Sequence, residues 1–404
     1  MRVLHVIPAV APRYGGPSTA IAPMCRALST RGVESVIATT DADGAGRLPV
    51  PIGEQTMWQG VPAIFFGKAF TESFKYSSSL ATWVALNVRG FEIVHIHGLL
   101  SHACLAASAA CRRRAVPYLV RPLGTLVPWS LHQKAIKKRL LLAFGGMTAL
   151  RGAAAIHYTS EQERQSVEAT LGLERGVVVP LGIDPAFVDG PLTAARERER
   201  DLYVLAMSRI HPKKNLEALI DAFIGSTSAA GCERWRLVIA GTGEPAYVRS
   251  LQRLVDDRQA RARVKFVGWI DGEAKLALLR RASVFALCSK HENFGLAVLE
   301  ALAAGVPALL SRQVDLADQV ETAKAGWIVE DGDDSLCTAV TAAIGKSVER
   351  EARGRAAREL ARRFAWPVVA MQLAEMYQTI LPQVGLSLGT SRPSTESLPG
   401  LAPR

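Results

Sequence analysis

Two glutamates eight positions apart are the first residues of this sequence whose spacing could serve a ligand. Glu292 and Glu300 bound the segment ENFGLAVLE, and good helix formers run from Gly295 to Ala304 before Gly305, which predicts a helix that opens near Phe294. Over eight helical positions the chain rises about 12 Å and turns the two carboxylates roughly 80° apart. They therefore suit opposite ends of an extended polyol, with helix N–H groups offered to an anion between them, rather than an acid/base pair. An amphipathic helix with a solvated Glu300 is the alternative.

Two cations follow the apolar run YVLAM in the segment SRIHPKKN. Arg209 ends the expected strand and Lys214 precedes the next expected helix, so both lie at the carboxyl end of a parallel strand, where α/β sheets bind ligands. Planar Arg and compact Lys suit a diphosphate, whose charge rises when its bond to a sugar breaks. A solvated loop is the alternative, above all for the neighbouring Lys213.

Two further segments place polar or flexible residues at expected strand ends. In IVHIHG, His95 and His97 share one face of a strand, and His97 stands at its end before Gly98. We interpret His95 as a structural residue and His97 as a candidate for ligand contact. In PRYGGPS, Gly15 and Gly16 would let the backbone approach a phosphate or sugar, although a plain tight turn is an equal explanation.

The elements that must position these residues form two series. Short apolar runs alternate with longer Ala/Leu/Arg stretches from VLHVIPAV to YLVRP, and the alternation starts afresh near Leu202, which is typical of βα units with a parallel sheet. At 404 residues the chain is long enough for two domains and a cleft. The predicted fold class is therefore α/β, with two Rossmann-like doubly wound domains facing across a cleft.

The predicted domain limits follow the loss of apolar periodicity. The first domain should cover residues 1–185 and the second residues 186–365, with a linker near 185–200. A helix is expected over 366–384, and the polar tail 385–404 is expected to be disordered.

Composition excludes several classes of protein. Hydrophobic residues make up 49% and charged residues 21%, which excludes collagenous, coiled-coil and wholly disordered chains. The six cysteines never occur as Cys-x-x-Cys, which favours reduced thiols in a cytoplasmic protein over disulfides or a zinc cluster. The apolar N-terminal run predicts a first strand rather than a leader. The sequence contains no uninterrupted run of 18 apolar residues, so we expect no membrane span.

The net charge of +11 has one main source. No acidic residue occurs from Ile93 to Ser160, a stretch that holds nine Lys or Arg residues. Within SLHQKAIKKRLLLAF, a single helix would place three lysines on one face beside apolar residues, as expected of a helix on an anionic leaflet. A solvated helix face is the alternative. The residues of this predicted membrane or acceptor surface are Lys134, Lys137, Lys138, Arg139 and the interfacial aromatic Trp129.

Six segments in order carry a family resemblance. They are GGPS, IVHIHG, SRIHPKKN, IAGTGE, VKFVGWIDGEAK and, most specific, ENFGLAVLE followed by AAGVPALLS. With them the chain resembles family 4 of the retaining glycosyltransferases, in the bacterial branch that builds polysaccharides and lipid-linked glycans, from Met1 to about Leu381. The resemblance implies the glycosyltransferase-B fold, an acceptor-binding first domain, a second domain for the nucleotide sugar, and a C-terminal helix that returns to the first domain.

The resemblance also implies a role for each matching residue. Arg209 and Lys214 would hold the diphosphate, Glu292 would contact sugar hydroxyls, and Glu300 would bind the ribose. The remaining nucleotide-sugar contacts would come from Asn293, Phe294, Gly295, Gly241, Gly16 and His97, and Glu292, Arg209, Lys214 and His97 would form the catalytic set. The sequence departs from the family pattern at Asn215, where glycine is common, and at Leu181, where asparagine is usual.

The function implied is transfer of a hexose from a UDP- or GDP-linked sugar to a lipid-linked or oligosaccharide acceptor in cell-surface polysaccharide biosynthesis. Retention would follow a front-face displacement assisted by the leaving diphosphate. We expect no cofactor and no metal, because the Asp-x-Asp at Asp41 and Asp43 is interpreted as a solvated loop. The enzyme would be cytoplasmic, with peripheral contact to the inner membrane leaflet.

Two other functions fit parts of the pattern. A sugar-nucleotide epimerase or hydrolase could use the same fold, although the cationic first domain favours a bulky acceptor. A nucleic-acid binder would explain the net charge, but the sequence has no aromatic-interleaved basic surface or recognition helix, so no nucleic-acid partner is expected.

Overall fold

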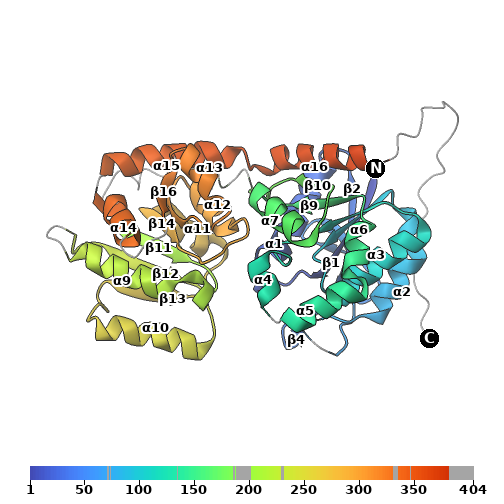
Figure 1. Ribbon diagram of the computed structural model, residues 1–404, viewed down its shortest axis with the longest axis horizontal. Coiled ribbons are helices and arrows are strands. Elements are labelled where there is room, and N and C mark those ends of the chain that lie inside the picture. Colours follow the sequence, from blue (N-terminus) through green and yellow to red (C-terminus); the bar gives the residue numbers. More distant parts are fainter. Residues whose placement is uncertain are drawn as a thin grey trace. The chain divides into compact units, whose positions relative to one another are not determined.

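The chain folds into two compact units in the computed structural model, which describes residues 1–70, 72, 74–133, 135–184, 187, 202–228, 232–330, 335–345 and 347–381. One unit comprises Met1–Pro180 with Trp366–Arg404, and the other comprises Leu181–Ala365 (Figure 1). The division falls five residues before the expected limit at residue 185. Most of the expected linker and all of the tail 385–404 lie outside the described residues.

The first unit is built on an eight-stranded sheet within the described part of the chain. Its order is β10-β9-β8-β7-β1-β2-β6-β5, and every pairing is parallel except that of β5 with β6. The central strands are buried along their whole length, as expected of a parallel sheet covered on both faces. The strands are β1 Arg2–Ala9, β2 Glu34–Thr40, β5 Gln55–Trp58, β6 Val61–Phe66, β7 Ile93–His97, β8 Tyr118–Arg121, β9 Ala155–Tyr158 and β10 Gly176–Val178, beside a small hairpin of β3 Ala42–Asp43 and β4 Gly46–Arg47.

Helices follow the strands of the first unit in alternation. Serine side chains cap three of them, with Ser77, Ser101 and Ser160 accepting backbone N–H groups at the starts of α2, α3 and α7. The last helix, α16, packs against α1. The helical segments are η1 Pro12–Tyr14, α1 Gly16–Ser29, α2 Ser78–Asn87, η2 Val88–Gly90, α3 His102–Arg114, α4 Pro128–His132, α5 Ala135–Leu141, η3 Leu142–Gly146, α6 Met147–Arg151, α7 Glu161–Leu171 and α16 Trp366–Ile380.

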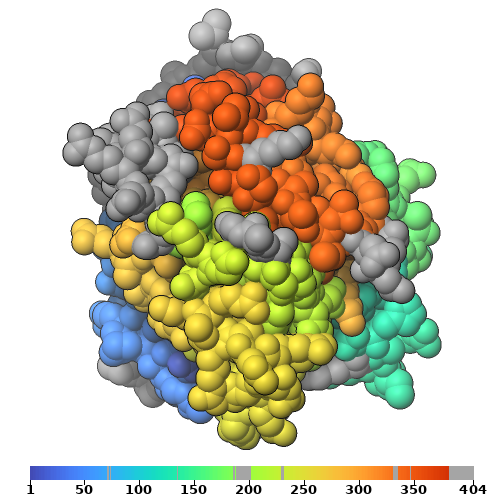
Figure 2. All heavy atoms as spheres, turned by 90° about the vertical axis from the view of Figure 1, so that its left-hand side faces the viewer, coloured from blue at the N-terminus to red at the C-terminus, as the bar shows by residue number. Residues whose placement is uncertain are grey.

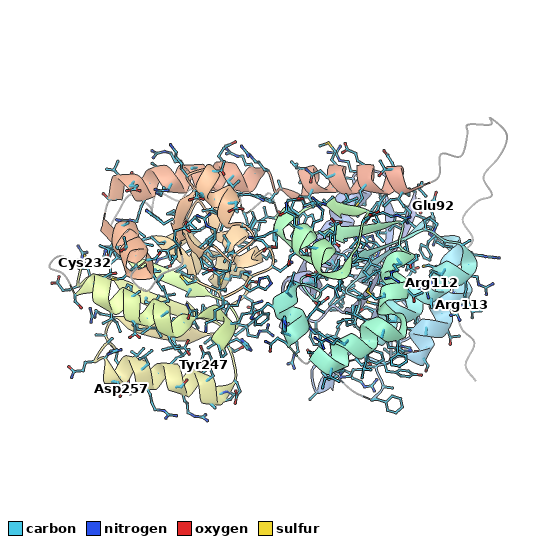
Figure 3. All side chains as sticks on the ribbon, viewed as in Figure 1. Glu92, Arg112, Arg113, Cys232, Tyr247 and Asp257 are labelled. Carbon is cyan, nitrogen blue, oxygen red and sulfur yellow. The ribbon has the colours of Figure 1, made fainter. Side chains whose placement is uncertain are left out.

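The second unit is a parallel sheet of order β13-β12-β11-β14-β15-β16. Helices α10, α9 and α14 lie side by side over it, and Figure 2 shows them as yellow, yellow-green and red-orange surfaces. Tyr247 joins α10 to α9 by donating to Glu217 (2.7 Å) (Figure 3). The elements are β11 Tyr203–Met207, η5 Pro212–Lys214, α9 Leu216–Thr227, β12 Arg236–Ala240, α10 Pro245–Asp257, β13 Val264–Gly268, α11 Gly272–Arg281, β14 Val284–Leu287, α12 Leu296–Ala303, β15 Ala308–Ser311, α13 Ala317–Thr322, β16 Gly326–Val329, α14 Ser335–Gly345 and α15 Ser347–Arg362.

Two local predictions meet opposite outcomes. The helix expected from Gly295 to Ala304 is confirmed as α12, capped by Gly295. The single helix expected across residues 130–144 is wrong, because the chain turns extended at Gln133 (φ −74°, ψ 118°) and separates α4 from α5. None of the described helices is both long and apolar enough to cross a bilayer.

Candidate active site

The residues singled out in the second unit gather at one edge of its sheet. β11 and β14 are neighbours there, but β12 continues on one side and β15 on the other. Such a switch point opens a crevice at the carboxyl ends of the strands. Arg209 follows β11, and Glu292 lies in the loop after β14. The first unit repeats the arrangement at β1 and β7, so each sheet carries its candidate residues at its own switch point.

An ion pair stands at the centre of the second site. The Nζ of Lys214 donates to Oε2 of Glu292, and the two side chains are only 12% and 18% exposed. Backbone bonds hold both loops in register: Lys290 N donates to Lys213 O (2.9 Å), and Glu292 N donates to Gln313 O (2.9 Å). The carboxylate is therefore fixed beside a cation before any ligand binds.

Positive charge exceeds negative charge around this pair. Arg209 is exposed and forms no ion pair with a residue that the structure describes. Burial lowers the pKa of Lys213, and Lys214 and Arg209 lower it further, while Glu292 opposes them. Burial and the same three cations lower the pKa of His211. This loop therefore presents a positive field suited to a diphosphate.

The start of α12 adds backbone donors to this field. Phe294 and Gly295 both have left-handed backbones, with φ of 60° and 83°, and Gly295 is the N-cap of α12. A left-handed backbone is strained for phenylalanine, and its buried ring packs edge-on against Phe364 at 5.9 Å. Gly295 N donates back to Asn293 O (2.8 Å). The N–H groups of Leu296 and Ala297 have no acceptor within α12 and lie at its positive end, whereas Val298 N already donates to Gly295 O (2.9 Å).

Glu300 lies at the other end of the same site and has a partner that sequence reasoning missed. Its Oε1 accepts from Lys275 Nζ of α11 at 2.6 Å, although Glu300 is only 8% exposed. Burial raises the pKa of Glu300, and Lys275 lowers it in return. The motif VKFVGWIDGEAK contains Lys275, but nothing in the spacing of the two residues pairs them.

Gly241 lets two loops beside the candidate site pack closely. A Cβ at this position would lie 1.9 Å from the Ser208 carbonyl, and one at Gly243 would lie 2.0 Å from the carbonyl of Ile210. Both glycines therefore let the loop after β12 lie flush against the loop that carries Arg209.

In the first unit, the candidate glycines and His97 lie at the carboxyl edge as expected. Gly15 (φ 88°) caps α1 and Gly16 is its first residue. His97 ends β7, and Gly98 (φ 94°) donates to Arg121 O (2.7 Å). The side chain of His97, however, is only 2% exposed.

His97 belongs to a buried cluster of four histidines. His97 Nε2 lies 3.1 Å from His5 Nδ1, while His95 bonds Tyr377 Oη (2.8 Å) and His157 Nδ1 (3.1 Å). Tyr377 comes from α16. Sequence reasoning missed His5, His157 and Tyr377, because three strands and a distant helix bring them together. The one available signal for His5 was a histidine inside an apolar run.

The imidazoles of this cluster are held neutral. Burial and then Arg121 lower the pKa of His5 to about 3. Burial also lowers the pKa values of His95, His97 and His157 well below the ordinary value. Arg121 is itself buried, and burial lowers its pKa to about 10.

The cluster also contains a possible set of metal ligands. One nitrogen each of His5, His95 and His97 lies within 4.8 Å of the others, and neutral imidazole is a common zinc ligand. A dication would stand close to buried Arg121, and both nitrogens of His95 already have hydrogen-bond partners. These contacts disfavour a metal, and the absence of a metal stays a prediction.

Comparison with known proteins places this geometry in a family. A glycosyl transferase 4-like domain matches residues 15–182, and glycosyl transferases group 1 matches residues 193–360. The chain belongs to the GT-B glycosyltransferases, as a family 4-like member. The Anabaena HepE structure with UDP and glucose has a TM-score of 0.72 at 19% identity, covering 94% of this chain and 100% of HepE.

Two curated relatives differ in how much they cover. A phosphatidyl-myo-inositol mannosyltransferase of Mycobacterium leprae is 31% identical over 42% of this chain and 44% of the relative. A GDP-mannose:cellobiosyl-diphosphopolyprenol alpha-mannosyltransferase of Komagataeibacter xylinus is 24% identical over 94% of each chain. The chain spans about half the length of the first relatives that it matches, 44% and 52%.

The two departures of this glycosyltransferase from its family pattern have different local settings. Asn215 has a left-handed backbone (φ 54°), which asparagine tolerates better than most residues, so it can replace glycine there. Leu181 is buried, at 5% exposed, and offers no polar group at its position.

The basic segment of the glycosyltransferase is arranged differently from its prediction. Lys134 lies outside the described residues. Lys138 turns back to α4, where its Nζ donates to Ser130 O (2.6 Å) and Oγ (2.8 Å). Lys137 and Arg139 remain exposed, and Trp129 is 36% exposed. Of the two described lysines, Lys137 is exposed and Lys138 bonds to α4, so they do not share one outward face.

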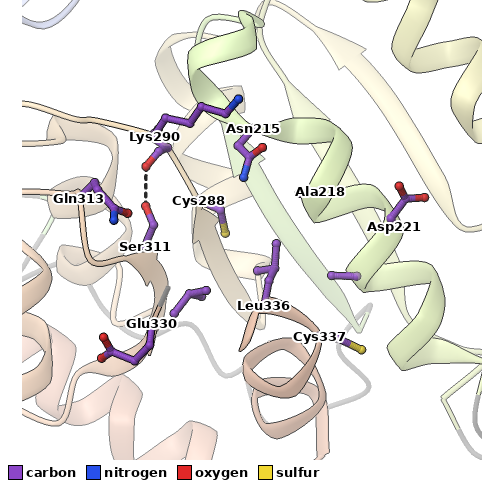
Figure 4. Close-up of a pocket in the computed structure, with 13 residues that line it drawn as sticks. Asn215, Ala218, Asp221, Cys288, Lys290, Ser311, Gln313, Glu330, Leu336 and Cys337 are labelled. Carbon is purple, nitrogen blue, oxygen red and sulfur yellow. Dashed lines mark hydrogen bonds between the residues drawn. The ribbon is translucent and has the colours of Figure 1, made fainter. Parts of the chain in front are cut away.

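A separate cavity of about 630 Å³ lies between α9 and α14 (Figure 4). Its described lining includes Lys290 and Asn215 but neither Glu292 nor Arg209. The ion pair of this glycosyltransferase therefore stands at the sheet edge, beside the cavity and not within it.

Proposed function

We propose that this glycosyltransferase is a retaining, metal-independent enzyme that moves a hexose from a nucleotide sugar to a lipid-linked or oligosaccharide acceptor in cell-surface polysaccharide biosynthesis. One observation carries the proposal: the Lys214–Glu292 pair stands beside Arg209 and before the positive end of α12. Such a site offers cations to a diphosphate and a carboxylate to sugar hydroxyls.

The nucleotide sugar would extend along the edge of the second sheet. Arg209, Lys214 and the N–H groups at the start of α12 would bind the diphosphate, and Glu292 would accept hydrogen bonds from the hexose. Glu300, paired with Lys275, would accept from the ribose. Buried acceptors of this kind discriminate strongly against ligands that lack the matching hydroxyl.

Transfer would break the bond between the anomeric carbon and the diphosphate oxygen, and form the new bond to the acceptor oxygen on the same face. The acceptor proton would pass to the leaving diphosphate. Arg209 and Lys214 would stabilise the charge that develops there. No second carboxylate is then required as a nucleophile.

Metal independence is supported by the surroundings of the Asp-x-Asp segment. The interpretation as a solvated loop is wrong for Asp41, which is 2% exposed, pairs with Arg47 (2.9 Å) and accepts from Lys68 N (2.7 Å). Asp43 pairs with Arg13 (2.7 Å). Both carboxylates are thus engaged by arginines rather than offered to a metal-bound diphosphate.

GDP-mannose is the first nucleotide sugar to test. The relative from Komagataeibacter xylinus, named for GDP-mannose and a diphosphopolyprenol-linked acceptor, covers 94% of this chain. UDP-glucose is the second, because the HepE fold binds UDP and glucose in its own structure. A lipid-linked acceptor suits the cationic first unit.

The surface around α5 supports peripheral contact with an anionic leaflet. Ile136 and Leu140 are 78% and 52% exposed and, four positions apart, share one face of α5. Lys137 and Arg139 flank that face on its two sides. Phe144 is 81% exposed just beyond it. Apolar side chains bordered by cations are the pattern of an interfacial helix.

Two measurements test the function. The midpoint of thermal unfolding, measured with UDP- and GDP-linked sugars, should rise for one nucleotide class, because a ligand that binds only the folded state stabilises it. That nucleotide sugar should then label a diphosphopolyprenol-linked acceptor with the anomeric configuration retained. An inverted product would reject the retaining mechanism, and sugar release without any transfer would favour a hydrolase.

A further inference from the structure

The bond between His5 and His97 is part of a longer chain of hydrogen bonds. His5 uses both ring nitrogens: Nε2 lies 3.2 Å from Ser35 Oγ, and Nδ1 lies 3.1 Å from His97 Nε2. All three residues belong to neighbouring strands of the first sheet, with β1 between β2 and β7. The chain runs from near the start of β2 to the end of β7, and so toward the carboxyl edge where ligands bind.

Neutral imidazoles allow only two proton arrangements along this chain. If Ser35 donates to His5 Nε2, then His5 Nδ1 carries a proton and donates to His97 Nε2, and the remaining proton of His97 is on Nδ1. If every bond runs the other way, His97 Nδ1 carries no proton and can only accept. Burial and Arg121 exclude the doubly protonated ring at neutral pH by lowering the pKa of His97.

The surroundings of Ser35 favour the first arrangement. Ser35 and the thiol-bearing Cys25 both line a surface cavity of about 260 Å³. The serine oxygen can therefore accept a hydrogen bond from water while its own proton goes to His5. An imidazole nitrogen is a better acceptor for that proton than sulfur, and hydrogen bonds that run in one direction strengthen one another.

His97 is also held from its other side. The ring of His95 lies 4.2 Å from that of His97, centroid to centroid, and His95 is itself fixed by Tyr377 and His157. No described residue bonds His97 Nδ1. The nitrogen left for a ligand is therefore Nδ1.

We propose that His5 is a positioning residue of the transfer site: Ser35 donates to His5, His5 donates to His97 Nε2, and His97 thereby presents Nδ1–H as a fixed hydrogen-bond donor to an oxygen of the hexose or diphosphate. The proposal rests on the proposed function. In this arrangement the tautomer of His97 is fixed before the substrate binds. A ring whose tautomer is set in advance needs no reorganisation when charge develops on the leaving group.

The tautomer can be read without any activity assay. In the full chain with ¹⁵N-labelled histidine, long-range ¹H–¹⁵N NMR separates a protonated from an unprotonated ring nitrogen, and H97Q identifies the signals of His97. We expect a single Nδ1–H tautomer in the wild type and a mixture in H5L. S35A, which changes only the far end of the chain, should also give a mixture and guards against misfolding of H5L.

Kinetics then separate positioning from simple packing. H5L should lower kcat about tenfold, as expected for one lost hydrogen bond to the reacting system, with KM for the nucleotide sugar changed less than about threefold. H5N places an amide where Nδ1 was and should restore kcat to within about threefold of the wild type.

Three results would overturn the proposal: an Nε2–H tautomer at His97 in the wild type, an unchanged tautomer in H5L, or a lost tautomer with unchanged kcat. If the chain transfers no sugar to any acceptor, the proposed function fails instead, and the NMR measurement still decides whether the hydrogen-bond chain sets the tautomer.

Discussion

The carboxylate of Glu300 and the ammonium group of Lys275 are paired at 2.6 Å where Glu300 is only 8% exposed. The pKa of Glu300 is raised by burial in spite of this partner. An acid whose folded-state pKa is raised stabilises the fold below its unfolded pKa and loses that contribution as pH rises through the folded pKa.

Replacing Lys275 should therefore cost more stability at neutral than at acid pH. In K275M, Glu300 keeps its burial but loses its cation, so its pKa should rise further. The free energy of unfolding should fall by about 2 kcal/mol at pH 7.5 and clearly less at pH 5. Denaturant unfolding at both pH values measures this. K275M/E300Q is the control and should remove the pH dependence; an equal loss at both pH values would contradict the pairing.

The Lys214–Glu292 pair and Arg209 should control transfer and leave the fold intact. We expect E292Q and R209A to lower kcat/KM at least about 100-fold, because each removes charge at the developing diphosphate or a partner of the hexose. R258A removes an exposed arginine that pairs with Asp221 (2.9 Å) and should change activity little. Transfer within threefold of the wild type in R209A would reject this site.

Chelation should have no effect on transfer. Asp41 and Asp43 pair with Arg47 and Arg13, so the diphosphate would be neutralised by side chains instead of a divalent ion. Initial rates with excess EDTA should equal those with added Mg²⁺ or Mn²⁺. A strong loss that a divalent ion restores would show that the reaction needs a metal.

Membrane binding should need both the cations and the apolar face of α5. K137Q/R139Q should weaken binding to anionic vesicles roughly 30-fold at low salt, at about 1 kcal/mol per cation, and less at high salt. I136S/L140S should weaken binding at any salt concentration. Vesicle sedimentation measures both.

A matched pair of arginines lies elsewhere on the first unit. Arg112 and Arg113 are exposed at the end of α3 (Figure 3). R112Q/R113Q removes the same charge as K137Q/R139Q. If both double variants lose vesicle binding equally, net charge alone explains the effect. That result would reject α5 as the membrane contact.

Acid should destabilise the first unit through its histidines. Burial lowers the pKa values of these histidines in the folded chain. At acid pH the unfolded chain therefore binds protons that the folded chain does not bind. Above the unfolded pKa of about 6.5 the buried histidines leave the free energy of unfolding unchanged. Below that pH, the free energy of unfolding falls by about 1.4 kcal/mol per pH unit for each histidine. The midpoint of thermal unfolding, measured between pH 5 and 8, should fall less steeply with decreasing pH in H157Q than in the wild type. Parallel curves would mean that His157 takes up its proton in the folded state.

Local signals explain what the sequence could predict. The start and end of α12 follow from Gly295 and Gly305, and the strand-and-helix alternation predicted parallel sheets. The break at Gln133 has no glycine or proline to mark it; the bonds from Lys138 to Ser130 accompany it and depend on how α4 and α5 pack. The histidine cluster depends on register, since His5 pairs with His95 across β1 and β7. Such partners are set by the assembled sheet and not by spacing along the chain.

The contact between α16 and α1 has a consequence for synthesis of the protein. The last helix of the first unit is formed by residues 366–380. The ribosome must therefore synthesise the whole second unit before α16 can pack against α1 and complete the first unit. Tyr377 cannot reach His95 until then. A truncation that ends before Trp366 should therefore leave an apolar surface for chaperones to bind, even though every strand of that sheet has been made.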